Sequence, residues 1–221
     1  MTSDPAATRD VADWRREYSD RGLTEADLGD DPIRAFEVWL GDAHTAGLHE
    51  PNAMVVSTTD RSAAPTSRMV LLKTVDRRGF VFYTNLGSAK AADLLARPAC
   101  SLLFPWHPLQ RQVRIDGAAE LVDDDEADAY FATRPRGSQL GAWASPQSQV
   151  VRGRDELDAR YAAEVERFAG VDDVPRPPQW SGFLVRPRRV EFWQGRPGRM
   201  HDRVRYERTG EQTWATERLA P

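Results

Sequence analysis

The sequence predicts a mainly β protein with flanking helices (α+β), built around an antiparallel sheet that closes into a barrel. Five segments after residue 53 alternate apolar and polar side chains with a period of two, which is typical of half-buried strands. Short connections and one interposed helix join these segments, so a barrel is favoured over a doubly wound fold. The five segments are Ala53 to Thr59, Thr66 to Val75, Gly79 to Thr84, Ala99 to Phe104 and Arg111 to Leu121.

The composition bounds the function and the location. The 221 residues carry a formal net charge of -4 with a pI near 5.6, which argues against a general nucleic-acid role. Cys100 is the only cysteine, so an internal disulfide and a cysteine-based zinc site are excluded. The first residues lack the apolar core of a signal peptide, and no run approaches the roughly 18 apolar residues of a membrane span. We therefore expect a soluble cytoplasmic protein with no metal, nucleic-acid or membrane partner.

The N-terminal part of the chain predicts an arm followed by a single domain. Residues 1–30 are polar and are expected to be a mobile arm, and residues 31–221 are expected to form one domain. Asp31 as N-cap and Pro32 at the first helical position begin the first clear helix, and Gly47 is a natural stop. Apolar residues at helical spacing predict that this helix packs on the core: Phe36, Trp39, Leu40 and Ala43.

The two lysines of the chain, Lys73 and Lys90, lie on either side of a predicted hairpin with its turn at residues 76–79. Lysine is a compact mobile charge where arginine is a planar fork, so lysines retained in an arginine-rich chain suggest anion sites; chance survival is the alternative. Ser88 predicts an N-cap that places Lys90 in the first turn of a helix. A cation there is unfavourable by up to about 1 kcal/mol unless an anion binds. Ser88, free backbone N–H groups and Lys90 therefore predict a phosphate site.

The fifth predicted strand and the helix after it carry further polar candidates. Gln112, Arg114 and Asp116 share one face of the strand, which is either a solvent face or a surface for a ligand or partner subunit. The acidic run at 123–126 indicates a helix start more than a metal site. Tyr130 and Arg134 are four apart and share a helix face, and Ser138 follows a Pro135 turn, so these three could hold a second phosphate.

The C-terminal third predicts an amphipathic helix, a proline-rich connection and late strands. Leu157, Tyr161, Val165 and Phe168 mark the helix, and "VPRPPQW" at 174–180 reads as an extended connection. Alternation in "GFLVRP", "RRVEFWQG" and "DRVRYER" indicates strands that complete the sheet. In "GRPGRMHDR", Arg199, His201 and Arg203 are two apart and share a face if the segment is extended, which would suit an anionic ligand; a structural histidine is the alternative.

Taken together, these segments resemble the pyridoxamine 5'-phosphate oxidase family of FMN enzymes. The resemblance rests on "WRREY", "DPIRAFEVWL", "EPNAMVVST", "RMVLLK", "VFYTNLGSAK", "SLLFPWHPLQRQVRIDG", "RPRGSQLGAW", "VEFWQG", "RMHDR" and "ERLAP", in family order along nearly the whole chain. It implies a split β-barrel homodimer with two FMN sites at the subunit interface. It also implies the oxidation of pyridoxamine or pyridoxine 5'-phosphate by oxygen to pyridoxal 5'-phosphate, with release of hydrogen peroxide and, from the amine, ammonia.

The resemblance also implies roles for individual residues. Two of them are implied to act at the substrate's reacting edge as catalytic residues, Arg199 and His201. The FMN contacts fall on Arg68, Met69, Val70, Leu71, Leu72, Lys73, Tyr83, Thr84, Ser88, Lys90, Gln112, Gln147, Ser148, Trp193 and Arg203. The substrate contacts fall on Lys73, Tyr130, Arg134, Ser138, Arg199 and His201, with Arg15 to Tyr18 as a closing arm that contributes Arg15 and Tyr18.

Two features depart from a simple match to the family. The family often has arginine between the serine and the lysine of "GSAK", and Ala89 stands there, so we expect weaker FMN binding. Strand parity also puts Arg68 and Lys73 on opposite faces, so the strand must bulge or end between them if both touch ligands. The alternatives are a related split-barrel flavin enzyme acting on another substrate, such as a phenazine precursor, and a carrier that binds FMN or pyridoxal phosphate without turnover.

Overall fold

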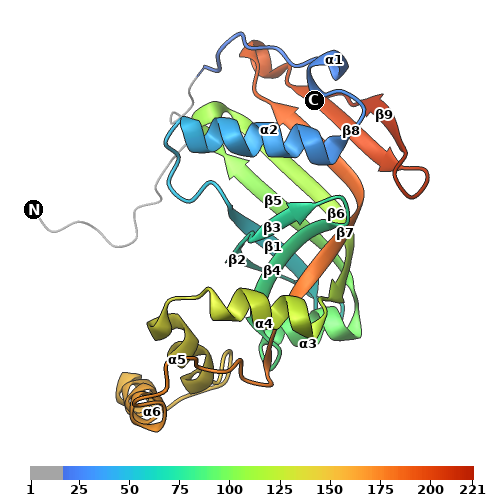
Figure 1. Cartoon of the computed structure of the whole chain (residues 1–221). Helices are drawn as coiled ribbons and strands as arrows, with labels where there is room; N and C mark the ends of the chain where they lie inside the picture. The colour runs from blue at the N-terminus through green and yellow to red at the C-terminus, as the bar shows by residue number, and fades with distance from the viewer. Residues whose placement is uncertain (1–16) are drawn as a thin grey trace, which may run out of the picture.

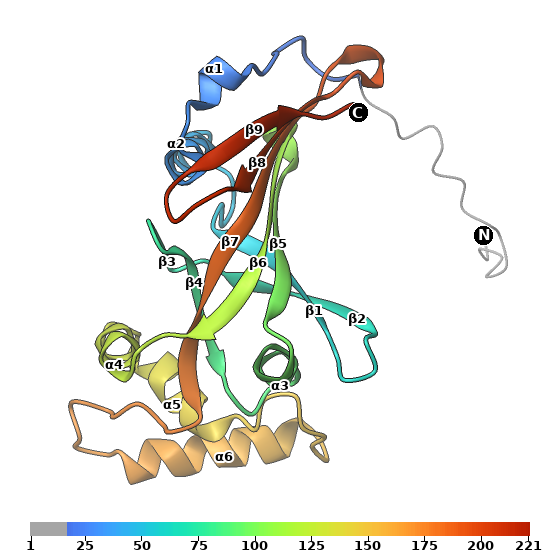
Figure 2. The same cartoon turned by 90° about the vertical axis from the view of Figure 1, so that its right-hand side faces the viewer.

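The computed structural model describes residues 17–221, in which nine strands form one antiparallel sheet (Figures 1 and 2). The sheet order is β2-β1-β5-β6-β7-β4-β3, with β8 on β7 and β9 on β8. The first and last strands of that order, β2 and β3, are separated by two residues of chain, so the sheet closes on itself as a barrel with an open side. The strands are β1 Ala53–Thr59, β2 Pro65–Leu71, β3 Thr74–Asp76, β4 Gly79–Asn85, β5 Ala99–Trp106, β6 Arg111–Leu121, β7 Trp180–Gln194, β8 Asp202–Arg208 and β9 Trp214–Arg218.

Helices cover the two ends of this sheet. The helix α2 packs near the end that also carries α1, β8 and β9, whereas α4, α5 and α6 gather at the opposite end (Figures 1 and 2). The strand β7 runs from one end to the other. The helices are α1 Glu25–Leu28, α2 Pro32–Thr45, α3 Ala89–Ala96, α4 Asp124–Ala132, α5 Arg136–Ala144 and α6 Arg154–Arg167, with short 3₁₀ turns at His107–Leu109 and Pro197–Arg199.

The main core lies between α2 and the concave face of the sheet. Asp31 accepts a hydrogen bond from the Ile33 N–H and caps α2, as the sequence predicted. The fully buried Phe36 of that helix packs edge-to-face on Phe80 and Phe104, with ring centroids 4.9 and 4.8 Å away. Aromatic pairs of this geometry add to the burial of apolar area, so the predicted stripe of α2 is confirmed as core.

The predicted single strand over Thr66 to Val75 is wrong, because the strand ends at Leu71 and β3 begins at Thr74. The side chain of Leu72 turns into the core, with 4% of the residue exposed. Its N–H donates to the Asn52 carbonyl, and its own carbonyl accepts a hydrogen bond from Asn52 Nδ2. The chain then changes neighbours from β1 to β4, with the Lys73 N–H donating to the Val81 carbonyl at 2.8 Å. The condition set by strand parity, an end between Arg68 and Lys73, is met.

The two late strands expected in 182–195 form one strand, β7, which contains Pro187. The pairing of β6 with β7 shifts register between Asp116 and Gly117, which forms a bulge opposite Pro187. A proline is tolerated there because the missing N–H would not take part in the hydrogen bonds between the strands. Three elements have no counterpart in the sequence analysis: α1, α5 and β9. In α6 no residue is buried, and of its predicted apolar stripe only Phe168, just beyond the helix, enters a core cluster.

The segment 17–30, expected to belong to the arm, packs on the C-terminal strands. Leu23 and Leu28 are buried in the main core, and the hydroxyl of Tyr206 donates to the Gly29 carbonyl at 2.6 Å. Within the described residues, no helix is long and apolar enough to cross a bilayer.

Candidate active site

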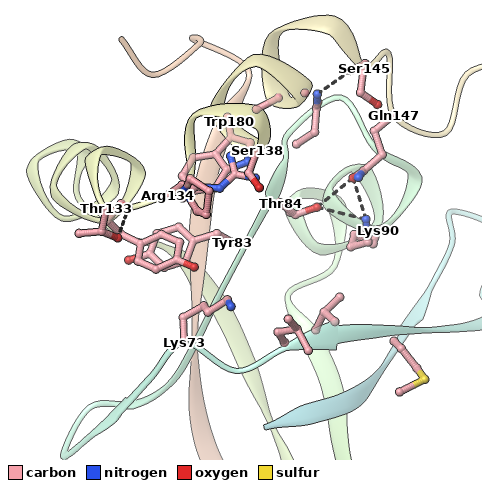
Figure 3. Close-up of a pocket in the computed structure, with 18 residues that line it drawn as sticks. Lys73, Tyr83, Thr84, Lys90, Thr133, Arg134, Ser138, Ser145, Gln147 and Trp180 are labelled. Atoms are coloured by element: carbon pink, nitrogen blue, oxygen red, sulfur yellow. Dashed lines mark hydrogen bonds between the residues drawn. The ribbon is translucent and has the colours of Figure 1, made fainter. Parts of the chain in front are cut away.

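A cavity of about 610 Å³ opens where β2, β4, α4, α5 and the start of β7 meet. It is within the size range of small-molecule sites. Figure 3 shows polar side chains on two sides of it, with Lys90, Thr84 and Gln147 on one side and Arg134 and Ser138 on the other. Part of its apolar lining comes from the end of β2, at Met69, Val70 and Leu71.

The Lys90 side of the cavity is built by the N-terminus of α3. Ser88 caps this helix, its hydroxyl accepting from the Ala91 N–H at 3.4 Å, so the predicted cap is confirmed. The Lys90 ammonium donates to Thr84 Oγ1 at 3.1 Å, Ser88 Oγ at 3.3 Å and Gln147 Oε1 at 2.9 Å. Burial lowers the pKa of Lys90, and the nearby Arg68 guanidinium lowers it further. An ammonium held by neutral oxygens at a helix N-terminus is suited to binding an anion.

The Arg134 side is built by the junction of α4 and α5. Arg134 follows the end of α4, and Ser138 lies in the first turn of α5, whose N-terminus faces the cavity region. The Arg134 Nη1 atom is buried and has no hydrogen-bond partner among the described residues. Burial lowers the pKa of Arg134, and Tyr130 partly offsets that shift. A buried donor without a partner is costly, and an anion in the cavity would satisfy it.

Lys73 reaches the same cavity from the break between β2 and β3. Its side chain is exposed, and Figure 3 shows its ammonium directed toward the Tyr83 ring and the cavity. The structure thus brings together Lys73, Lys90, Tyr83, Thr84, Tyr130, Arg134, Ser138 and Gln147 of the predicted residues. Burial raises the pKa of Tyr83 to about 12, so its phenol stays protonated.

A second group of predicted residues lies at the far end of β7. Strand register places Gln112 opposite Trp193, and Trp193 opposite Arg203, in one row across β6, β7 and β8. Trp193 is thirteen positions along β7 from Trp180 of the cavity, which at about 3.3 Å per residue is roughly 40 Å of strand. One chain therefore carries two separate groups of predicted site residues.

This second group continues into the loop before β8 and into the N-terminal segment. The His201 ring lies 4.6 Å from that of Trp193 and 5.4 Å from that of Tyr18, and the Arg199 guanidinium lies 5.5 Å from the Tyr18 ring. The Arg196 N–H donates to His201 Nδ1 at 3.1 Å, so a neutral His201 carries its proton on Nε2. Burial lowers the pKa of His201, and the Arg199 charge lowers it further.

The expectation of an extended segment through Arg199, His201 and Arg203 is wrong. Residues 197–199 form a 3₁₀ turn in which Arg199 has a left-handed backbone with φ of 63°. Arg203 turns to β7, where its Nε donates to the buried carboxylate of Glu191 at 2.8 Å. Arg199 and His201 still meet around Tyr18, because the turn brings them there.

Several predicted residues do not line the cavity. Arg68 donates to Thr58 Oγ1 at 2.7 Å and to Thr66 Oγ1 at 2.6 Å, beside the buried Asp93. The side chain of Leu72 faces the core, and its backbone groups are already paired, so it is not placed for a ligand contact. Ser88 is fully buried and acts through Lys90, and Ser148 is exposed with φ of 70°. Arg15 lies outside the described residues.

Seven residues of the cavity lining were not among the predicted site residues: Asn85, Thr133, Pro135, Gly141, Ala142, Ser145 and Trp180. Trp180 could have been found from the sequence, because it is an aromatic residue that ends a proline-rich connection at the start of a strand, where its position is fixed. The others line the cavity through tertiary contacts, as when Asn85 Nδ2 donates to the Ser145 carbonyl at 3.2 Å.

Comparison with known proteins places this cavity in a family. The family model described as pyridoxamine 5'-phosphate oxidase matches residues 40–194, which include every residue of the cavity. The chain belongs to the pyridoxamine 5'-phosphate oxidase family. The model described as the pyridoxine 5'-phosphate oxidase C-terminal dimerisation region matches residues 180–221, which carry Trp193, Arg199, His201 and Arg203 of the second group.

Relatives of this oxidase family match nearly the whole chain. A protein of Nocardioides sp. named pyridoxine/pyridoxamine 5'-phosphate oxidase is 58% identical over 96% of this chain and 98% of its own length. One of the same name from Rubrobacter xylanophilus is 54% identical over 97% of this chain and 98% of its length. The crystal structure of PhzG from Burkholderia lata, in complex with tetrahydrophenazine-1-carboxylic acid, is 32% identical with a TM-score of 0.85, covering 91% of this chain and 98% of that one. The split-barrel fold is confirmed.

Proposed function

We propose that this chain oxidises pyridoxamine or pyridoxine 5'-phosphate to pyridoxal 5'-phosphate, with FMN as cofactor and oxygen as electron acceptor. The observation that carries the proposal is that one cavity presents two separate cationic groups, Lys90 on one side and Arg134 with Lys73 on the other. FMN and the substrate each carry one phosphate, so two anion sites around one cavity match the pair of ligands. Family membership supports the same activity.

The residues around the cavity fit FMN. The Lys90 ammonium and the N-terminus of α3 would hold its phosphate, with Thr84 and Gln147 as further polar partners. The apolar segment Met69 to Leu71 would lie along its ring. When bound, FMN would supply a hydride acceptor that oxygen can reoxidise, with oxygen itself reduced to hydrogen peroxide.

The chain's own residues would bind and orient the substrate. Arg134, Lys73, the Tyr130 hydroxyl and the Ser138 hydroxyl would grip its phosphate. With the phosphate fixed, the carbon that carries the amine or alcohol is held in one place, so that a hydride would leave this carbon and a proton would leave the attached nitrogen or oxygen. The alcohol gives the aldehyde directly, whereas the imine formed from the amine takes up water and releases ammonia. In both cases the two electrons reduce oxygen to hydrogen peroxide.

We further propose that each complete site takes its second half from the other subunit of a homodimer. Within one chain, roughly 40 Å of β7 separates the cavity from the group at Trp193, Arg199 and His201. A two-fold axis repeats both groups, so the second group of one subunit can close the cavity of its partner. The match of residues 180–221 to a dimerisation region supports this arrangement.

Mixed dimers test the shared site. Arg134→Ala and Arg199→Ala, each made alone, should lose most of the oxidation of pyridoxamine 5'-phosphate. In an equal mixture allowed to exchange subunits, half the dimers are mixed and each holds one intact site of two, so about one quarter of the wild-type activity should return. No recovery after exchange, with mixed dimers verified by two affinity tags, would place both halves within one chain.

An assay on both vitamin phosphates tests the activity itself. Flavin-loaded protein incubated with each substrate in air should form hydrogen peroxide and pyridoxal 5'-phosphate in equal amounts. Tight binding of both ligands without peroxide would instead support a carrier. A second candidate, oxidation of a phenazine precursor, is favoured only by the PhzG structure at 32% identity, against 48–58% for the relatives named as vitamin phosphate oxidases. The cytoplasmic location expected from the sequence stays a prediction.

A further inference from the structure

Trp180, the first residue of β7, lies behind the polar residues of the cavity. Its side chain is almost fully buried, with 5% of the residue exposed. Three aromatic rings lie nearly parallel here: Tyr83 is 5.2 Å from Trp180 with an angle of 5° between the planes, and 4.1 Å from Tyr130 with an angle of 14°. The Trp180 and Tyr130 ring centroids are themselves 6.1 Å apart, so the three rings form a triangular cluster in which the indole lies beside Tyr130, a proposed phosphate ligand.

The same indole carries the Arg134 guanidinium. Arg134 Cζ lies 4.7 Å from the Trp180 ring and 5.4 Å from the Phe131 ring. Among the described residues Arg134 forms no salt bridge, and its Nη1 atom is buried without a hydrogen-bond partner. By contrast Arg176, four residues before Trp180, binds the carboxylates of Asp124 and Asp128.

This difference has a chemical consequence. A carboxylate beside Arg134 would occupy its N–H donors and compete with a phosphate, whereas an aromatic face attracts the cation without accepting those in-plane hydrogen bonds. A guanidinium held by ring faces keeps its orientation and its donors. It is therefore prepared to bind a phosphate when one enters.

The position of Trp180 is fixed from behind and from the side. Arg176 bridges α4 and β7, with its Nη1 donating to the Trp180 carbonyl at 2.7 Å while it pairs with Asp124 and Asp128. Gly182 lies under the Tyr83 ring, and a Cβ at that position would stand 2.8 Å from two atoms of the ring. The proline-rich connection at 174–180 thus delivers the indole to a defined place.

We propose that Trp180 is a positioning residue of the substrate phosphate site: its indole orients the Arg134 guanidinium and, together with Tyr83, the Tyr130 ring. This inference rests on the proposed function, since it assigns the phosphate of the vitamin substrate to Arg134 and Tyr130. Trp180 acts through these residues, because the donors assigned to the phosphate are the guanidinium of Arg134 and the hydroxyl of Tyr130.

The variants Trp180→Leu and Trp180→Phe separate this role from simple packing. Trp180→Leu should raise the KM for pyridoxamine 5'-phosphate roughly 3- to 30-fold, the range set by a cation–π contact, with kcat changed less than KM. Trp180→Phe keeps a ring face and should recover most of the loss. The Kd of FMN should stay within about twofold of wild type in both variants, since Lys90 lies on the other side of the cavity.

Trp214→Leu is the matched control, because Arg208 lies 4.5 Å from the Trp214 ring in the same kind of contact at the other end of the molecule. It should leave the KM unchanged. A double-mutant cycle adds a direct test of coupling. In an Arg134→Ala background, Trp180→Leu should raise the KM by no more than about twofold, because the guanidinium that it orients is gone and only its effect on Tyr130 is left.

Binding of inorganic phosphate, followed by calorimetry, tests the inference without turnover. Trp180→Leu should weaken phosphate binding by the same factor by which it raises the KM. Gly182→Ala, which displaces the Tyr83 ring, should also weaken phosphate binding. An unchanged KM and unchanged phosphate binding in Trp180→Leu would overturn the inference, as would an equal loss of FMN and phosphate affinity. If Trp180→Leu fails to fold, Trp180→Phe and Gly182→Ala decide, and wild-type phosphate affinity in both overturns it. Absence of oxidation by the wild-type protein would refute the proposed function alone.

Discussion

Lys73 and Lys90, the two lysines of the chain, line one cavity from different sides (Figure 3). Lys90 is held by three oxygens at the N-terminus of α3, while Lys73 projects from the break between β2 and β3 toward Tyr83. The two ammonium groups thus belong to different surroundings in the same cavity. They are expected to serve different ligands.

Separate substitution of the two lysines should change different constants. Lys90→Gln removes a charge-assisted contact to the FMN phosphate, so the Kd of FMN should rise roughly 10- to 100-fold. Lys73→Gln should mainly raise the KM for pyridoxamine 5'-phosphate and leave the Kd of FMN within a few fold. Flavin fluorescence titration and steady-state kinetics at saturating FMN measure the two constants. A rise in the same constant for both variants would contradict the assignment of two anion sites.

Introducing the arginine that the family often has should tighten flavin binding. Ala89 is exposed at the first position of α3, next to Lys90, so Ala89→Arg would place a guanidinium at the phosphate end of the cavity. We expect the Kd of FMN to fall about 5- to 10-fold, in line with one added charge-assisted hydrogen bond. Ala96→Arg, exposed in the last turn of the same helix, adds the same charge away from the site and should change the Kd little. An equal effect of both variants would indicate net charge and not a local contact.

Loss of the Arg199 side chain should affect turnover far more than flavin content. Arg199 lies in the second group beside Tyr18 and His201, and its left-handed backbone fixes the direction of its side chain. Arg199→Ala should lower kcat/KM by 100-fold or more, on the order of one lost charged contact in the transition state, while bound FMN per subunit stays near wild type. Met200→Ala, at an exposed neighbouring position, serves as the control. Equal losses of flavin and turnover would assign Arg199 a structural role.

The pKa of His201 predicts an acid limb in activity. Burial and Arg199 hold this pKa below its ordinary value of 6.5, so His201 is neutral at pH 7. As pH falls below 6.5, the unfolded chain binds the proton first, so the contribution of this group to stability declines with falling pH. Protonation of Nδ1 would also break the hydrogen bond from the Arg196 N–H. We expect kcat/KM to fall at pH values below the ordinary 6.5 of histidine, through the lowered pKa, and His201→Asn to show a lower plateau without that limb.

Local features of the fold and site were within reach of the sequence. Ser88 caps α3, Asp31 caps α2, and the hairpin turn at 76–79 joins β3 to β4, because caps and turns depend on residues a few positions apart. Lys90 and its helix N-terminus follow from the same local rules. The residue roles inferred by resemblance gathered Lys73, Tyr130, Arg134 and Ser138, and the cavity holds all four.

The sequence by itself thus determined the alternating strands, the helix ends and the types of charge that the site requires. The tertiary structure alone decided where those charges meet: Leu72 turns into the core and frees Lys73, Arg68 pairs with Thr58 and Thr66, and Trp180 supports Arg134. It also set the two groups of site residues at opposite ends of β7. The reason is physical, since side-chain periodicity reports the environment of one segment, whereas contacts between segments depend on strand partners and register, which are fixed when the whole sheet packs.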